Sequence, residues 1–390
     1  MGVDMTSRTL LMSGWRFIPH SYAVVCQAEA LEFARRPGVR VCFEDLPYVD
    51  PAWRPTPALL GEHVERELRG LSPPPPGMCA DAELRFAYPM DFLQPPRAAR
   101  TVVFCTVEAL ELSSGHVPAG YAAADAQRVH DLPVLTCSQW SREGLLRSGI
   151  REDRVLVVPL GFDPVIYRPA GAEARLRQRA ALGFRPEEFV FFHAGAMTPN
   201  KGLRFLFEAF ARLLADYPDA RLLLKGTDAL YDSATLLARH LDHLAPADAQ
   251  AVRERVRYVG DALGAEAMAG LYHAADCYVS SYIAEGFNLP VLEAAACGLP
   301  VICTAGGPTD DFVTDDFALR IESLRGAIQS PGTTAAIGLI PDGDHLLHLM
   351  LCVIDDAEFR AQAREAGPAH THRDYTWARV VDRLMPVLLP

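Results

Sequence analysis

The sequence predicts an α/β protein made of two doubly wound, Rossmann-like domains. Short apolar runs that favour strands alternate with helical patterns along most of the chain, as in parallel sheets covered by helices. A length of 390 residues exceeds what one ordinary hydrophobic core holds, so two domains are expected. Residues 159–169 contain three prolines and a glycine, and this stiff segment marks the boundary between the domains.

In the first half, residues 13–22 are expected to form a loop, which a helix at Ala23–Ala34 follows. The tetraproline at 73–76 cannot lie inside a helix and is interpreted as a surface loop. Apolar, β-branched runs predict strands at Val39–Phe43, Thr101–Thr106, Val134–Cys137 and Val155–Pro159.

The second half has the more regular alternation. Strands are predicted at Phe189–His193, Ala220–Lys225, Val256–Val259, Cys277–Ser281 and Pro300–Cys303. Helices are predicted at Leu203–Leu214, Ala234–His243, Ala265–Ala274, Pro290–Cys297, Asp344–Val353, Ala357–Ala366 and Tyr375–Leu384. Residues 324–340 show little periodicity and are expected to form a long loop.

Composition excludes several classes of protein. The net charge of −12 argues against nucleic acid as the main partner. No apolar run approaches the roughly 20 residues of a membrane helix, and no secretion signal is evident at the N-terminus. The nine cysteines are an odd number and lie mostly in apolar runs, which is typical of reduced packing residues. A cytoplasmic protein without a metal or other cofactor is therefore expected.

The segment from Glu285 to Glu293 is the most informative part of the chain. It follows an apolar strand pattern and runs into a helix pattern that ends at Gly298, so one carboxylate lies on a loop and the other on a helix. Backbone N–H groups at such a helix start favour phosphate. Two carboxylates beside a phosphate suit a ligand rich in hydroxyls, and a sugar nucleotide has both features.

Glu285 and Glu293, with the flanking Gly-Phe-Asn-Leu-Pro, resemble the E-x7-E signature of retaining glycosyltransferases of the GT-B fold, in particular family four (glycosyl transferases group 1). The resemblance extends over about residues 134–313. It implies that Glu285 binds the hydroxyls of the donor sugar and that Glu293 binds the ribose. It also implies an N-terminal acceptor-binding domain, residues 1–165 plus 374–390, and a nucleotide-sugar-binding domain, residues 166–373.

The same resemblance places the diphosphate beside Lys201, after the Gly195 loop. Only two lysines occur in the chain, Lys201 and Lys225, and the compact ammonium suits a diphosphate. The family usually carries an arginine at the position of Ala196, so this chain departs from it there. Further donor-site residues are expected at Lys225, Gly260, Gly286, Phe287, Asn288 and Leu289.

For the acceptor side, the first loop after a strand faces the site in this fold. It supplies Gly14, His20, Ser21 and Tyr22. Catalytic candidates are Glu285, Lys201, His20 and Glu108, the last because it follows a strand. His20 is equally well explained as a helix cap. Weaker candidates are His116 and His130, and His193 is expected to pack.

The resemblance predicts a front-face reaction, in which the departing phosphate deprotonates the acceptor hydroxyl and no metal takes part. The partners are then a nucleoside-diphosphate sugar and a saccharide or natural-product acceptor, with no nucleic acid and no integral membrane segment. Two alternatives stay open, a pseudo-glycosyltransferase that forms no glycoside and a non-catalytic sugar-nucleotide-binding homologue. The donor sugar, the base, the acceptor and the oligomeric state are not predicted.

Overall fold

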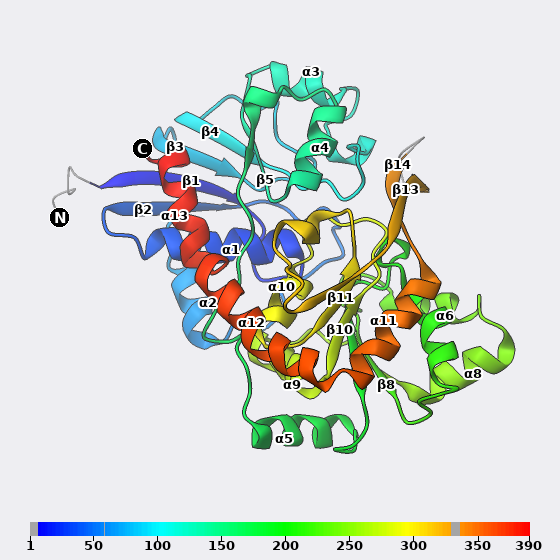
Figure 1. Cartoon of the computed structure of the whole chain (residues 1–390). Coiled ribbons are helices and arrows are strands. Elements are labelled where there is room, and N and C mark those ends of the chain that lie inside the picture. The colour runs from blue at the N-terminus through cyan, green and yellow to red at the C-terminus, as the bar shows by residue number, and fades with distance from the viewer. Residues whose placement is uncertain (1–6, 58, 329–335) are drawn as a thin grey trace. The chain divides into compact units, whose positions relative to one another are not determined.

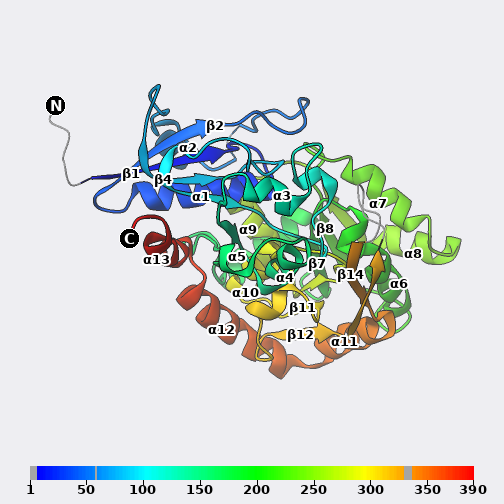
Figure 2. The same cartoon turned by 90° about the horizontal axis from the view of Figure 1, so that it is seen from above.

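The chain divides into two compact units, each of which is a parallel sheet covered by helices. The structure, a computed structural model, describes residues 7–57, 59–328 and 336–390. Among these, unit 1 takes the residues within Met1–Gly161 and Tyr375–Pro390, with Ile328 and Ala336. Unit 2 takes Phe162–Ala327 and Ile337–Asp374. Figures 1 and 2 label the elements of both units from two directions.

Unit 1 is built on a sheet of six parallel strands among the described residues, in the order β2-β1-β3-β4-β5-β6. The strands are β1 (Arg8–Gly14), β2 (Val39–Asp45), β3 (Ala80–Arg85), β4 (Ala98–Phe104), β5 (Val134–Thr136) and β6 (Val155–Val157). The helices are α1 (Ser21–Ala34), α2 (Glu62–Arg69), η1 (Ser114–His116), α3 (Ala123–Arg128), α4 (Gln139–Arg147), η2 (Glu152–Arg154) and α13 (Trp377–Leu388). The C-terminal α13, red in Figure 1, packs against α1, β3 and β4.

Two strands of this sheet, β1 and β3, were not predicted, and the predicted loop at 13–22 is wrong at both ends. Ser13 and Gly14 end β1, while Ser21 begins α1. The strand was missed because Leu10, Leu11 and Met12 are fully buried, and a strand buried on both faces shows no alternation. The strand β3 was missed because it contains buried charged residues.

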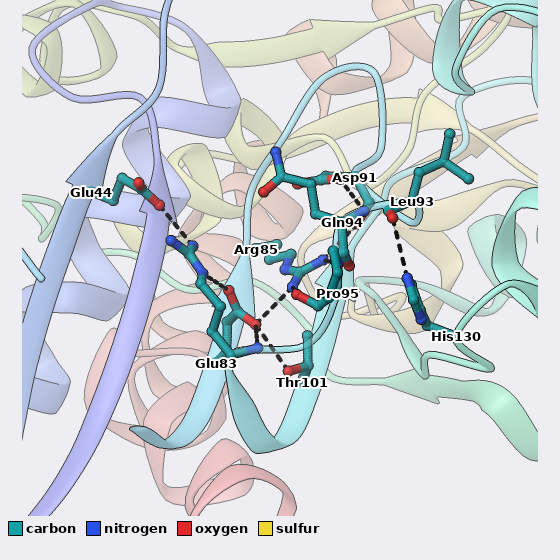
Figure 3. A network of polar contacts seen from close by, with 10 residues as sticks. Glu44, Glu83, Arg85, Asp91, Leu93, Gln94, Pro95, Thr101 and His130 are labelled. Carbon is teal, nitrogen blue, oxygen red and sulfur yellow. Dashed lines mark hydrogen bonds and ion pairs between the residues drawn. The ribbon is translucent and has the colours of Figure 1, made fainter. Parts of the chain in front are cut away.

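Those buried charges, Glu83 and Arg85, lie two residues apart on β3 and so on the same face of the strand. Arg85 donates to the Glu83 carboxylate at 2.8 Å and to three carbonyls of the following loop, those of Asp91, Gln94 and Pro95. The carboxylate also accepts from Thr101 and Arg97. Figure 3 shows this network. It ties the β3–β4 connection to the sheet.

Unit 2 has a second sheet of six parallel strands among the described residues, in the order β12-β11-β10-β7-β8-β9. The strands are β7 (Val190–Ala194), β8 (Arg221–Lys225), β9 (Val256–Val259), β10 (Cys277–Ser280), β11 (Val301–Thr304) and β12 (Ala318–Ile321). The helices are α5 (Ala172–Leu182), η3 (Pro199–Lys201), α6 (Leu203–Leu213), α7 (Ser233–Leu241), α8 (Pro246–Arg255), α9 (Ala265–Ala274), α10 (Leu289–Ala296), η4 (Pro308–Asp311), α11 (Gly343–Asp355) and α12 (Ala357–Asp374).

The core of unit 2 lies under helices on both faces of this sheet. On one face α6 and α11 pack side by side over the strands, and their buried positions recur every three or four residues. On the other face α9 covers β7, while α10 packs against α12. Figure 2 shows α6 and α11 next to each other. The predicted strands and helices of this half are all found, with shifts of a residue or two at most ends and longer C-terminal helices.

The predicted long loop at 324–340 is wrong where the structure describes it. Two strands, β13 (Ser323–Ile328) and β14 (Ala336–Pro341), pair as a separate small sheet, and residues 329–335 lie outside the described residues. β13 is half-exposed and contains a glycine, and the burial of its residues does not alternate regularly. The sequence therefore lacks the pattern by which a strand is predicted. In the described ranges, no helix has the length and apolar character that crossing a membrane requires.

Candidate functional site

Lys201 and Glu285 meet at the point where the strand order of unit 2 reverses. β7 and β10 are neighbours in the sheet although the chain visits β8 and β9 between them. In open parallel sheets, ligands bind outside the carboxyl ends of strands at such a switch point. Lys201 follows β7 and Glu285 follows β10, and Lys201 Nζ donates to Glu285 Oε1 at 2.5 Å. Their side chains are 17% and 12% exposed.

The two loops that carry these residues are locked together. Gly202, between η3 and α6, has a φ of 68°, and a Cβ there would lie 1.7 Å from the Ser281 carbonyl oxygen. The Asn200 carbonyl accepts from Ile283 N–H at 2.7 Å, and the Asn200 amide donates to the Ala284 carbonyl at 3.2 Å. This close backbone approach holds the loops of Lys201 and Glu285 against each other.

Gly195 forms the floor beside Lys201. Its N–H donates to the Lys225 carbonyl at 2.9 Å, and the Lys201 stem passes 3.4 Å from where a Cβ at Gly195 would lie. His193 beneath it is buried as expected, and its Nδ1 bonds the Val279 carbonyl at 2.9 Å. Because a carbonyl only accepts, Nδ1 carries the proton; burial lowers the pKa of His193 to about 4, so the ring is neutral.

The start of α10 lies beside Glu285. Asn288 has a φ of 78°, and its amide donates to Ser280 Oγ at 2.9 Å, which fixes the turn at the end of β10. Its side chain makes no capping bond to the helix, so it does not cap the Leu289 N–H, while Pro290 has no N–H and the Val291 N–H donates to the Asn288 carbonyl at 3.1 Å. Phe287 stacks on Phe312 with ring centroids 4.8 Å apart. These contacts hold the glycine at 286 and the helix start in one rigid turn.

Glu293 lies one turn into α10, where two tyrosines hold its carboxylate. The Tyr272 hydroxyl donates to Glu293 Oε2 at 2.7 Å, and Tyr167 bonds the same carboxylate. Burial raises the pKa of Glu293 to about 7. Neither tyrosine was identified from the sequence, because both approach Glu293 from other elements and nothing in their local pattern distinguishes them from core residues.

Lys225 and Gly260 lie side by side at the ends of β8 and β9. Lys225 donates to the Gly226 carbonyl, and burial lowers the pKa of its ammonium to about 8. A Cβ at Gly260 would lie 1.8 Å from Asp228 Oδ2, and Tyr258 donates to the same carboxylate at 2.7 Å. The Lys225 backbone connects this rim to Gly195, so the predicted donor-side residues share one edge of the sheet.

The predicted acceptor-side residues of unit 1 lie around the start of α1. His20 caps the helix, since its Nδ1 accepts from Tyr22 N–H at 3.2 Å. Tyr22 is buried and its hydroxyl accepts from Thr106 N–H at 3.3 Å, while Ser21 is exposed. A Cβ at Gly14 would lie 2.6 Å from Cys26 Sγ, so this glycine gives room for close packing. The geometry of His20 matches the capping interpretation.

The remaining candidates of unit 1 lie on other loops. Glu108 is exposed, and its carbonyl accepts from Trp140 Nε1 at 2.8 Å. His116 Nδ1 lies 2.6 Å from Ser113 Oγ, and burial lowers the pKa of this histidine. His130 bonds the Leu93 carbonyl at 3.1 Å, as Figure 3 shows. The contacts of His116 and His130 are those of structural residues.

Within the described part of the chain, no group of three or more His, Cys, Asp and Glu side chains is arranged to hold a metal ion. All nine cysteines are free thiols, and seven of them are buried. The candidate site consists of the Lys201 ammonium, the carboxylates of Glu285 and Glu293 and backbone N–H groups at the edge of the unit 2 sheet, with the Lys225 ammonium at the end of the neighbouring strand β8.

Comparisons of the sequence find similarity to glycosyltransferases. A sequence model of the family described as glycosyl transferases group 1 matches residues 188–327, which include every predicted donor-side residue. A GDP-mannose-dependent monoacylated alpha-(1-6)-phosphatidylinositol monomannoside mannosyltransferase of Corynebacterium glutamicum is 27% identical over 59% of this chain and 55% of its own length. A D-inositol 3-phosphate glycosyltransferase of Rhodococcus opacus is 29% identical over 72% of this chain and 58% of its own length. The chain thus spans about half the length of these curated relatives.

Solved structures resemble the whole chain. The Anabaena HepE protein in complex with UDP-glucose has a TM-score of 0.67 at 17% identity, over 97% of this chain and 99% of its own. WaaG, a glycosyltransferase involved in lipopolysaccharide biosynthesis, has a TM-score of 0.64 at 15% identity, over 98% of this chain and all of its own. At these identities the likeness concerns the fold, and the chain has the GT-B fold.

Proposed function

From the match of residues 188–327 to glycosyl transferases group 1, we propose that this chain transfers a hexosyl residue from a nucleoside-diphosphate sugar to an acceptor hydroxyl, with retention of anomeric configuration. The carrying observation is the contact of Lys201 Nζ with Glu285 at the β7–β10 switch point, with Glu293 on the helix that follows. The diphosphate needs an ammonium, and the sugar and the ribose each need a carboxylate.

Each residue has a role that its chemistry supports. Lys201 pairs with the diphosphate, and the Leu289 N–H at the start of α10, which the Asn288 side chain does not cap, donates to it. Glu285 accepts from hydroxyls of the donor sugar, and Glu293 accepts from the ribose. Gly195 leaves space for the phosphates because it lacks a side chain. Position 196 is alanine, so Lys201 carries the charge neutralisation that an arginine shares in the family.

The reaction follows from these roles. As the sugar–phosphate bond lengthens, negative charge grows on the departing phosphate and is stabilised by Lys201 and the Leu289 N–H. That phosphate takes the proton of the acceptor hydroxyl, which attacks from the same face of the sugar. The protein contributes positioning and exclusion of water, and the scheme uses no metal.

The names of the relatives support a class of donor, and they do not single out one donor within it. One relative is called GDP-mannose-dependent, while the HepE structure contains UDP-glucose. We therefore assign the nucleoside-diphosphate sugars as a class, and the protein's own base is to be measured. The acceptor is a hydroxyl compound, bound by unit 1.

The test is a thermal-shift panel of GDP, UDP and their sugars on the full chain. A ligand at about 100 times its Kd stabilises by roughly 2.7 kcal/mol, which moves the melting temperature by several degrees. We expect a shift with one base, and a smaller shift in Lys201→Ala and Glu293→Ala. Arg204→Ala is the matched control, because Arg204 is exposed on α6 and pairs with Glu208.

A wild-type protein that no nucleotide stabilises would refute the proposal and favour a homologue without donor binding. Once an acceptor is turned over, proton NMR of the product separates the remaining alternatives. If the anomeric proton of the product shows the same configuration, axial or equatorial, as that of the donor sugar, the reaction retains the configuration. A product without a hydrolysable glycosidic bond indicates the pseudo-glycosyltransferase instead.

A further inference from the structure

Unit 1 contains a cavity to which no predicted site residue belongs. It measures about 500 Å³, within the range of small-molecule sites. Arg16, Phe17, Asp45, Tyr48 and Arg69 line it, together with a leucine and two prolines. Arg16 and Phe17 follow β1, Asp45 ends β2 and Arg69 ends α2. The cavity therefore lies beyond the carboxyl ends of two neighbouring parallel strands, where α/β sheets bind ligands.

One wall of the cavity is held in an unusual conformation. Phe17 has a φ of 65°, in the left-handed region that an aromatic residue rarely adopts. Its N–H donates to Gln27 Oε1 at 2.7 Å, and its carbonyl accepts from Thr56 N–H at 2.7 Å. Strained residues that surrounding contacts hold in this way are concentrated at binding sites. Here the strain places the ring under the guanidinium of Arg69, 4.2 Å from the ring centre.

Arg16 and Asp45 form the floor. Arg16 is 8% exposed and donates to both Asp45 oxygens, at 2.7 and 2.5 Å, and to the Leu68 carbonyl. Its guanidinium is thus committed to the protein and orients the carboxylate. Asp45 keeps further lone pairs, and its side chain is 58% exposed. Asp45 can therefore accept from ligand hydroxyls, and the Tyr48 hydroxyl, which donates to the Arg16 carbonyl, can accept as well.

Arg69 supplies the cationic side of the cavity. Its side chain is 60% exposed and pairs only loosely with Glu65, at 3.6 Å on the same helix. An exposed pair of this kind is worth little, so the guanidinium can turn to an anion at small cost. Arg16 and Asp45 pair with each other, so Arg69 is the remaining charged residue among those that line the cavity. A ligand with one anionic group matches Arg69.

We propose that this cavity is the acceptor site, and that the acceptor is a hydroxyl-rich ring, a saccharide or cyclitol, which carries one phosphate group. Its hydroxyls bond Asp45 and Tyr48, and its phosphate pairs with Arg69. The inference rests on the proposed function, which requires a hydroxyl acceptor in unit 1. It differs from the sequence-based assignment, which centred on His20.

The experiment is isothermal titration calorimetry of the full chain with two matched pairs of probes, myo-inositol 1-phosphate against myo-inositol and mannose 6-phosphate against mannose. A charge pair at an exposed side chain such as Arg69 is worth roughly 0.5–1 kcal/mol, or about twofold to fivefold in Kd. We expect the wild type to prefer at least one phosphorylated probe by this factor. Arg69→Gln should bring the ratio close to one, while Tyr48→Phe weakens both members of the pair.

Arg66→Gln is the control, because Arg66 is exposed on the same helix and bonds only the Glu62 carbonyl among the contacts described. It should keep the wild-type ratio. A ratio unchanged in Arg69→Gln would overturn the proposal, as would a wild type that binds GDP or UDP but none of the four probes. Nucleotide binding is measured on every variant, so a failed donor site and a failed acceptor site give different results.

Discussion

Lys201 Nζ lies 2.5 Å from Glu285 Oε1, so the two residues that we assign to different parts of the donor pair with each other. A diphosphate must take the ammonium away from this carboxylate, and the carboxylate repels the diphosphate. Glu285→Gln should therefore bind GDP or UDP several-fold more tightly than the wild type does. The same variant should lose the extra affinity that the sugar of the intact donor provides.

Titration calorimetry with the nucleoside diphosphate and with its sugar tests this prediction. Lys201→Ala is the opposite case and should weaken both ligands by about tenfold to a hundredfold, since it removes a charge-assisted bond. Arg204→Ala, on the exposed face of α6, should change neither. If Glu285→Gln weakened the diphosphate as much as the sugar nucleotide, the assignment of Glu285 to the sugar would be wrong.

Gly202 controls the distance between the two loops. Alanine at this position would place Cβ 1.7 Å from the Ser281 carbonyl oxygen at a φ of 68°, so the loops must move apart. We expect Gly202→Ala to lower the free energy of unfolding by at least about 3 kcal/mol and to abolish nucleotide binding. Gly171→Ala is the matched control, because a Cβ there contacts nothing within 4 Å. Equal melting temperatures for the two variants would contradict the close-packing argument.

The placement of Lys201 and Glu285 on turns at one edge of the sheet could be predicted, because the information is local. A strand pattern, a tight turn and a helix pattern occur in consecutive residues around both Lys201 and Glu285, and the ends of neighbouring parallel strands bring such turns together. The tyrosines at 167 and 272 could not be predicted, because their contact with Glu293 depends on how distant elements pack. The signal at His20 was equally consistent with a cap and a catalytic group, and the structure shows the capping bond.

The sheet of unit 1 was predicted less well, for a related reason. Strand prediction relies on alternation or on apolar runs, and β3 places Glu83 and Arg85 at fully buried positions. Buried charges are stable only with partners that the tertiary structure provides. The same limit applies to Phe17 and Asp45, whose cavity joins three elements that are far apart in the sequence.

Glu293 should make donor binding depend on pH. Burial raises its pKa to about 7, and the ionised carboxylate is the form that accepts from both ribose hydroxyls. Nucleotide affinity should therefore fall as the pH is lowered from 8 towards 6. Glu293→Gln should bind weakly with little dependence on pH in this range. Calorimetry in buffers of matched ionisation heat measures the nucleotide affinity of the wild type and of Glu293→Gln at each pH. Identical pH profiles for these two proteins would rule out the titration of Glu293 as the cause.

Arg85 holds the β3–β4 connection of unit 1. Arg85→Met would leave the buried Glu83 carboxylate without one of its cationic partners and three loop carbonyls without a donor. Removing one member of a buried pair costs about 3–5 kcal/mol, and we expect a loss of this size in urea unfolding. Arg66→Met, an exposed substitution on α2, should change stability by less than about 0.5 kcal/mol. Similar effects of the two substitutions would show that the network stabilises little.

Glu29 on α1 should make unit 1 less stable as the pH rises. Its side chain is 1% exposed, Oε2 has no hydrogen-bond partner among the described residues, and burial raises the pKa to about 8. The folded state therefore binds a proton that the unfolded state releases above its ordinary pKa of about 4.5. Stability from this group is fully present below that value and is lost as the pH rises towards 8.

Glu29→Gln keeps the shape and removes the titration. The free energy of unfolding of this variant should exceed that of the wild type by an amount that grows between pH 5 and pH 8 and reaches the order of 1–3 kcal/mol. Glu32→Gln is the control, since Glu32 lies on the same helix and pairs with Arg35 at the surface. Denaturant unfolding at four pH values measures both differences. A constant difference for Glu29→Gln across this range would mean that the carboxyl group of Glu29 is ionised in the folded protein.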